Sequence, residues 1–265
     1  MDRAALKRGG AVLAPSLLTV GNMACGFYAL LAVHRGEFVS AATAILVGMV
    51  FDALDGRVAR LVHGESMFGV EFDSLCDFLT FGVAPGHMMY AFILKDYGVW
   101  GFPIAFTFAM CGGLRLARFN AVAHDTGGSK THFTGLPIPG GAGVLAAFVL
   151  LYQIIEEGRP ARTWKLLMDQ IPLLYAAAPF MVLAIAFLMI STIPYPSFKQ
   201  AGPRRVTTLV VATLLGSVLF AYPTNAIFLI FFTYALLGPV SWLLRAALKL
   251  TGRAEAPASV DAPHP

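Results

Sequence analysis

Charged side chains are scarce in this sequence. Asp, Glu, Lys and Arg together make up 13% of its 265 residues, about half the share of an average soluble domain. Hydrophobic residues make up 57%, and the mean hydropathy is +0.71. So few charges cannot cover the surface of a water-soluble domain, and the composition predicts a polytopic membrane protein.

Cysteine is also rare. The three cysteines, Cys25, Cys76 and Cys111, lie in apolar surroundings and show no Cys-x-x-Cys spacing. This pattern excludes a disulfide framework and a thiolate zinc site. The sequence also contains no visible repeat of the length that builds solenoids.

Long apolar runs are abundant. Eight runs are each close to the length that crosses a bilayer as a helix, at residues 13–34, 38–60, 68–94, 98–119, 136–155, 172–191, 206–222 and 224–248. The predicted fold class is therefore all-α, a polytopic membrane helical bundle of about eight transmembrane helices. The Pro/Ala-rich tail, residues 251–265, is expected to be disordered.

Lysine and arginine are unevenly distributed around these runs. If the N-terminus is cytoplasmic, 14 of the 19 basic residues fall on the inner side of the membrane, as the positive-inside rule requires. The sequence thus predicts a multi-pass protein of the cytoplasmic membrane with its N-terminus inside. The net charge of +4 is explained by this topology and by a surface facing anionic lipid, and nothing indicates a nucleic-acid partner.

Four aspartates interrupt the apolar pattern in "FDALDGRVARLVHGESMFGVEFDSLCD" (51–77). Asp52 and Asp55 are three residues apart, and Asp73 and Asp77 are four apart, so each pair lies on one helix face. The short connection at 61–67 makes the two helices antiparallel neighbours, and the two acidic faces can meet. Because buried acids repel one another at high cost, we expect cations between them. Carboxylates suit Mg²⁺ or Mn²⁺ better than zinc.

Small residues and one arginine accompany the acids. Gly56, Ala59 and Gly69 leave room on the acidic faces for a neighbouring helix or a flat ligand. Arg60 ends the run with a guanidinium that can bind a phosphate. Together with metal-binding carboxylates, these residues predict a site for a pyrophosphate that carries a base.

Two other interpretations of the acids remain open at this point. Acids within the membrane also occur in cation-coupled transporters, and Asp52 could form a structural salt-bridge cluster with Arg57 or Arg60. Transporters often contain paired repeats with matching broken helices, but this stretch has no second copy in the sequence. The absence of a repeat favours an enzyme.

The spacing of these residues resembles the signature of the CDP-alcohol phosphatidyltransferases. The matching pattern is Asp52-x-x-Asp55-Gly56-x-x-Ala59-Arg60, eight residues, then Gly69-x-x-x-Asp73-x-x-x-Asp77. The resemblance implies an integral membrane enzyme with a six-helix core, usually a homodimer, with two divalent metal ions, Mg²⁺ or Mn²⁺. Such enzymes transfer a phosphatidyl group from CDP-diacylglycerol to an alcohol and release CMP.

The resemblance also implies a division of the chain. Residues 1–12 would form a cytoplasmic basic arm and residues 13–200 the six-helix core. Residues 201–250 would add two further transmembrane helices, followed by the tail at 251–265.

The family pattern implies roles for individual residues. Asp52, Asp55 and Asp73 would bind metal, and Asp77 would contact the second metal and act as the base on the acceptor hydroxyl. The residues expected to bind CDP-diacylglycerol are Gly56, Ala59, Arg60, Ser66 and Gly69, together with Thr19 and Asn22 from "PSLLTVGNMACG" (15–26).

Three further segments resemble the serine-transferring branch of the family, namely "LRLARFN" (114–120), "FTGLPIPGGAG" (133–143) and "STIPYPSFK" (191–199). They imply L-serine as the acceptor and phosphatidylserine as the product. Arg115, Arg118 and Asn120 would bind the serine carboxylate, since a guanidinium pairs with a carboxylate through two hydrogen bonds. Alternatively, the arginines extend to lipid phosphates, or the acceptor is a glycerol phosphate or an inositol phosphate. The polar loop 120–134 and His63 receive no role.

Overall fold

Helices make up almost all of the described part of this computed structural model, which covers residues 3–62, 67–126, 133–156, 171–195 and 223–250. In chain order the elements are α1 (Arg3–His34), α2 (Phe38–Val62), α3 (Met67–Asp77), the π-helix η1 (Phe78–Val83), α4 (Ala84–Phe92), the 3₁₀-helix η2 (Leu94–Trp100), α5 (Gly101–Thr126), β1 (Phe133–Thr134), α6 (Ile138–Glu156), α8 (Ile171–Ile190), β2 (Pro194–Tyr195) and α10 (Pro223–Leu250). The predicted helix 206–222 and tail 251–265 lie outside these residues.

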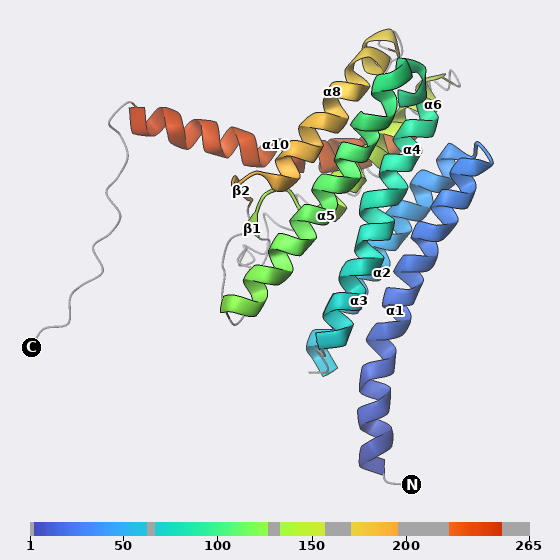
Figure 1. The fold of residues 1–265 in the computed structure, drawn as a ribbon, viewed down its shortest axis with the longest axis vertical. Helices are drawn as coiled ribbons and strands as arrows, with labels where there is room; N and C mark the ends of the chain where they lie inside the picture. Colours follow the sequence, from blue (N-terminus) through green and yellow to red (C-terminus); the bar gives the residue numbers. More distant parts are fainter. Residues whose placement is uncertain (1–2, 63–66, 127–132, 157–170, 196–222, 251–265) are drawn as a thin grey trace, which may run out of the picture.

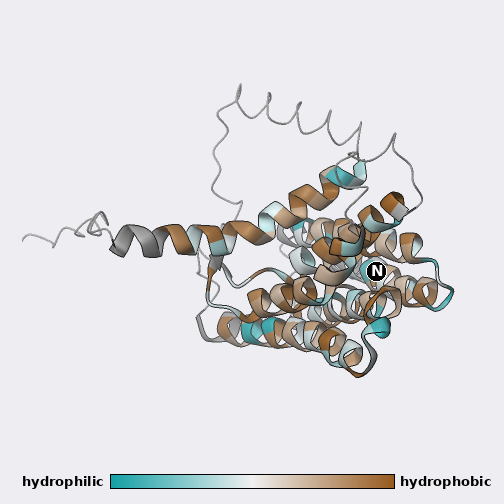
Figure 2. Cartoon of the chain, turned by 90° about the horizontal axis from the view of Figure 1, so that it is seen from above, coloured by the Kyte–Doolittle hydropathy of each residue, from teal (hydrophilic) through white to brown (hydrophobic). Residues whose placement is uncertain are grey.

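The helices have the length and composition of membrane spans. Six described stretches are long and apolar enough to cross a bilayer, and α3, η1 and α4 form another continuous helical run, residues 67–92. Large hydrophobic side chains such as Leu17, Phe106 and Phe180 are exposed on the outside, and Figure 2 shows hydrophobic residues predominating around the bundle. The prediction of an all-α, multi-pass membrane protein is confirmed.

Two helix ends differ from the predictions. Helix α1 begins at Arg3 rather than near residue 13, because Ala, Leu, Lys and Arg in this segment are strong helix formers. The predicted basic arm is thus part of the first helix. Helix α5 continues to Thr126 rather than ending at 119, so the first half of the predicted loop 120–134 is helical.

The predicted third helix is divided by a π-helix. The backbone hydrogen-bond pattern changes directly after Asp77, and η1 occupies Phe78–Val83. Pro85 lies in the first turn of α4, where its missing N–H is tolerated. A π-turn holds more residues than an α-turn and often occurs at functional sites. Here it follows the last of the four aspartates.

The helices surround α6, the most buried of the six spans, in which 72% of residues Ile138–Ile155 are buried inside the protein. Helices α1 and α2 pack against each other along their lengths, α2 also contacts α6, and α5 packs on α8. Helix α10 lies against α6, and its C-terminal part extends away from the bundle (Figure 1). Helices α2 and α3 bring Asp52, Asp55 and Asp73 together, and α3 begins toward the end of the bundle where α1 begins (Figure 1).

A two-stranded ribbon joins segments that are far apart in the sequence. Strand β1 pairs antiparallel with β2, with Phe133 opposite Tyr195 and Thr134 opposite Pro194. Gly135 follows with φ of 81°, and its N–H donates to the Ile193 carbonyl over 2.9 Å. The ribbon therefore brings together two of the three segments that resemble the serine-transferring branch.

Candidate active site

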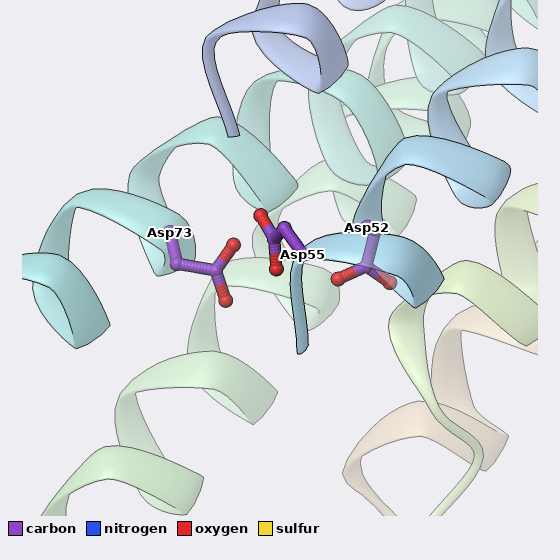
Figure 3. Close-up of side chains that lie close together, drawn as sticks. All are labelled: Asp52, Asp55 and Asp73. Atoms are coloured by element: carbon purple, nitrogen blue, oxygen red, sulfur yellow. The ribbon is translucent and has the colours of Figure 1, made fainter. Parts of the chain in front are cut away.

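Three of the four aspartates form one cluster. Asp52 and Asp55 from α2 and Asp73 from α3 each place a carboxylate oxygen within 4.8 Å of the others. Figure 3 shows Asp55 between the other two side chains. Asp55 is buried and its two partners are half-buried. Three acids of like charge in partial burial repel one another strongly, so the cluster fits a bound cation.

The fourth aspartate lies beside the cluster and is held by α1. Asn22 donates from Nδ2 to Asp77 Oδ1 over 2.9 Å, and Thr19 donates from Oγ1 to Asp55 Oδ2 over 2.7 Å. Both donors and both acceptors are buried. Asp77 interacts electrostatically with the three clustered acids. One face of α1 thus fixes one carboxylate from each acidic helix.

Thr80 fixes the position of Asn22. Its hydroxyl donates to the Asn22 carbonyl over 3.0 Å, and its side chain occupies a space between two glycines of different helices. A Cβ on Gly26 of α1 would lie 2.8 Å from Thr80 Cα, and one on Gly48 of α2 would lie 2.8 Å from Thr80 Cγ2. Neither glycine can therefore carry a side chain without moving η1.

Gly26→Ala is expected to lower stability, although alanine is the better helix former. The added methyl would overlap the Thr80 backbone, and overpacking of this kind costs about 1–3 kcal/mol. Thermal unfolding of the protein in detergent measures the change, with Ala24→Val, which adds methyls at an exposed position of α1, as the control. An unchanged melting temperature for Gly26→Ala, equal to that of the control, would contradict this packing.

The donor set fits a hard divalent cation. The ligand atoms available from Asp52, Asp55 and Asp73 are all carboxylate oxygens, which Mg²⁺ and Mn²⁺ prefer. Asp73 Oδ1 is buried and has no hydrogen-bond partner among the described residues. A buried carboxylate oxygen without a donor is costly, and a metal ion at the cluster would satisfy it.

The residues predicted to bind the nucleotide are described only in part. Gly56 follows Asp55 on α2, and Gly69 lies one turn before Asp73 on α3. The side chains of Ala59 and Arg60 and the whole of Ser66 lie outside the described residues. Thr19 and Asn22, expected to face the nucleotide, direct their hydrogen bonds to aspartates, so their nucleotide contacts remain a prediction.

Of the residues predicted to bind the acceptor, Arg115 is the buried one. It lies on α5 with 8% of its surface exposed, and its Nε has no hydrogen-bond partner among the described residues. Its guanidinium interacts electrostatically with Asp77. Arg115 is thus a buried cation that interacts with Asp77 and whose Nε–H has no acceptor among the described residues. These are the properties of an anion-binding group.

Arg118 and Asn120 already have partners in the protein. The Arg118 guanidinium donates to the carbonyls of Ile190, Thr134 and Ser191 over 3.0, 3.0 and 3.2 Å, so it ties α5 to the ends of α8 and β1. Asn120 donates from Nδ2 to Ser74 Oγ over 3.0 Å and to Glu71 Oε2 over 3.2 Å. Their binding of the acceptor remains a prediction.

The sequence analysis missed Thr80. The signal available was a hydroxyl residue three positions after Asp77 in an otherwise apolar run. On an ordinary helix this spacing already places Thr80 on the face of Asp77, but it does not reveal the contact with α1.

Comparison with known proteins shows which family this sequence matches. The family model described as CDP-alcohol phosphatidyltransferase matches residues 12–190. This segment contains the four aspartates, Arg115 and the elements from most of α1 to α8, whereas α10 lies outside it.

Several curated proteins are similar over most of their length. A CDP-diacylglycerol–serine O-phosphatidyltransferase of Helicobacter pylori is 33% identical over 87% of this chain and 91% of its own. One of Bacillus subtilis with the same name is 31% identical over 70% of this chain and 91% of its own. An archaetidylserine synthase of Methanothermobacter thermautotrophicus is 34% identical over 71% of each chain.

Proposed function

Because this chain belongs to the CDP-alcohol phosphatidyltransferase family, we propose that it transfers the phosphatidyl group of CDP-diacylglycerol to the hydroxyl of L-serine, giving phosphatidylserine and CMP. The observation that carries this proposal is the cluster of Asp52, Asp55 and Asp73 with Asp77 fixed beside it. The family match and the names of the relatives set the transporter interpretation aside.

Serine is the acceptor that the relatives have in common. The bacterial relatives are named as serine O-phosphatidyltransferases and the archaeal one as an archaetidylserine synthase. In this chain, Arg115 is the only buried basic side chain among the described residues. One guanidinium suits a carboxylate, whereas a glycerol phosphate or inositol phosphate would call for more positive charge. Arg115 is thus the residue we assign to the serine carboxylate.

Members of this family use divalent metal ions, and the clustered acids fit them. We assign two ions per site, Mg²⁺ or Mn²⁺, with Asp52, Asp55 and Asp73 as ligands and Asp77 shared with the second. Ions held there would neutralise the charge that develops on the transferred phosphoryl group and on CMP.

The protein's own residues supply positioning and proton transfer. Asp77 accepts the proton of the serine hydroxyl. At the same time, the serine hydroxyl oxygen forms the new bond to the phosphatidyl phosphorus. The bond between that phosphorus and the bridging pyrophosphate oxygen breaks, and CMP departs with the electron pair. Asn22 holds Asp77 in place through the bond to Oδ1. Because reacting groups must be closely aligned, this hydrogen bond contributes to the rate by fixing the Asp77 carboxylate.

The positive-inside pattern supports a cytoplasmic N-terminus and a site at the inner leaflet of the cytoplasmic membrane. CDP-diacylglycerol would then reach the site from the bilayer, and serine and CMP would exchange with the cytoplasm. We also expect a homodimer, as the family resemblance implies.

Membranes containing the protein, supplied with CDP-diacylglycerol and labelled L-serine, test the function. We expect labelled phosphatidylserine and CMP in equal amounts, and neither in membranes lacking the protein. Product formed with glycerol phosphate or inositol phosphate but not with serine would overturn the acceptor alone. Absence of CMP release with all acceptors would overturn the transferase.

A further inference from the structure

Asp77 has two carboxylate oxygens, and the protein holds one of them. Asn22 donates from Nδ2 to Asp77 Oδ1 over 2.9 Å, and no other hydrogen bond to this carboxylate comes from the described residues. A hydrogen bond is directional, so this one orients the carboxylate. It leaves Oδ2 as the oxygen that can take a proton from a substrate.

The Asn22 amide has little else to hold it. Asn22 is fully buried, and its Oδ1 has no hydrogen-bond partner among the described residues. A buried amide oxygen without a donor costs free energy. The side chain therefore gains its stabilisation from the bond to Asp77, and the position of the α1 backbone at Asn22 decides how well the two groups meet.

Thr80 fixes the α1 backbone at this residue. Its hydroxyl donates to the Asn22 carbonyl over 3.0 Å, and Thr80 is itself fully buried. Asp77 and Thr80 are three residues apart in the chain, and each bonds a different group of Asn22, the side chain in one case and the backbone in the other. Two attachments to one residue fix its rotation as well as its position.

The two branches of the Thr80 side chain have separate roles. The methyl group fills the space beside α2, where a Cβ on Gly48 would lie 2.8 Å from Thr80 Cγ2. The hydroxyl alone bonds α1. Packing and alignment therefore depend on different atoms, and substitutions can remove one without the other.

We propose that Thr80 is a positioning residue for the proton transfer: through the Asn22 carbonyl, its hydroxyl keeps the Asn22 amide on Asp77 Oδ1. Oδ2 of Asp77 then takes the proton of the serine hydroxyl, whose oxygen bonds the phosphatidyl phosphorus while CMP leaves with the electron pair. The proposal rests on the proposed function, because it takes Asp77 to be the base.

Kinetics of Thr80→Ser and Thr80→Ala test the proposal. Both variants lose the methyl group, and only serine keeps the hydroxyl. We expect kcat, measured as CMP release, to fall roughly ten-fold in Thr80→Ala, since small misplacements of a reacting group are costly. Thr80→Ser should stay within about two-fold of wild type, and KM for both substrates should be unchanged in both variants. Their melting temperatures in detergent should fall alike, by roughly 2–4 °C.

Thr80→Val gives the opposite combination, because valine keeps the methyl group beside Gly48 and lacks the hydroxyl. We expect its kcat to be as low as that of Thr80→Ala, although its packing on α2 is retained. If Thr80 served packing alone, Thr80→Val would retain wild-type kcat, and Thr80→Ser would lose as much activity as Thr80→Ala. Either result would overturn the proposal.

A double-mutant cycle shows whether Thr80 acts through Asn22. Asn22→Ala removes the amide that bonds Asp77 and keeps the carbonyl that accepts from Thr80. In this background, Thr80→Ala should change kcat by less than about two-fold more than Thr80→Ser does. A full ten-fold difference between the two in this background would show that Thr80 acts by another route, and the proposal would be wrong.

Thr43→Val is the matched control, because Thr43 is exposed on α2 and its hydroxyl donates to the Val39 carbonyl of its own helix over 2.7 Å. We expect wild-type kinetics for it, and a Thr80→Val that behaves like this control contradicts the proposal. A wild-type protein that makes no phosphatidylserine would instead refute the proposed acceptor. CMP release with another acceptor would still report on Thr80.

Discussion

Asp77→Asn is expected to abolish transfer to serine, lowering kcat by about 10²- to 10⁴-fold, the usual contribution of a positioned general base. Asparagine has nearly the same shape, and its Oδ1 can accept the hydrogen bond that Asn22 donates to Asp77. The fold and the packing around Thr80 should therefore persist. What is lost is the ability to take a proton from the serine hydroxyl.

Two measurements distinguish loss of the catalytic base from loss of substrate binding. CMP release reports turnover, and calorimetric titration with CDP-diacylglycerol in detergent reports binding, which we expect to remain. Asp96→Asn serves as the control, because Asp96 is an exposed aspartate on η2 that accepts a hydrogen bond from Tyr175. Normal turnover by Asp77→Asn would end the assignment of Asp77 as the base.

Loss of the metal site is expected to have an effect of at least similar size. Stabilisation of the phosphoryl charge by metal ions supplies several kcal/mol, so chelation or Asp55→Asn should reduce CMP release by about 10³-fold or more. An asparagine at this position can still accept the hydrogen bond from Thr19, but the substitution removes one negative charge from the cluster. The packing of α1 on α2 should therefore survive it.

Metal binding can be measured apart from turnover. Chelated wild-type protein should recover activity with Mg²⁺ or Mn²⁺, and titration with Mn²⁺ followed by electron paramagnetic resonance should show weaker binding to Asp55→Asn. Glu37→Gln, an exposed acid between α1 and α2, provides the control. Phosphatidylserine formation that persists in chelator at the same rate would refute the metal site.

The spacing of the aspartates was enough to predict the acidic cluster. Because α2 and α3 are joined by a short connection, pairs at three and four residues on each helix had to face each other. Thus Asp52, Asp55 and Asp73 converge as expected. Hydrophobic length likewise predicted each described span, because a membrane segment must be long, apolar and helical.

The contacts inside the bundle could not be predicted from the sequence. The π-helix at Phe78–Val83 adds residues to a turn without altering an apolar run that is buried on most sides. Strands β1 and β2 have two residues each and lie about 60 residues apart in the chain, too short for any alternation to appear. Arg115 and Arg118 share one face of α5, yet only their three-dimensional neighbours distinguish an unpaired Nε from a set of carbonyl contacts.

The glycines around Thr80 have a consequence for how substrate enters. Since Gly26 and Gly48 leave Thr80 no free volume on either side, α1, α2 and η1 cannot slide past one another without steric overlap. These elements should move as a single rigid body that carries Asp55 and Asp77 with it. Access for a two-tailed lipid must then be gained by displacement of elements beyond this body.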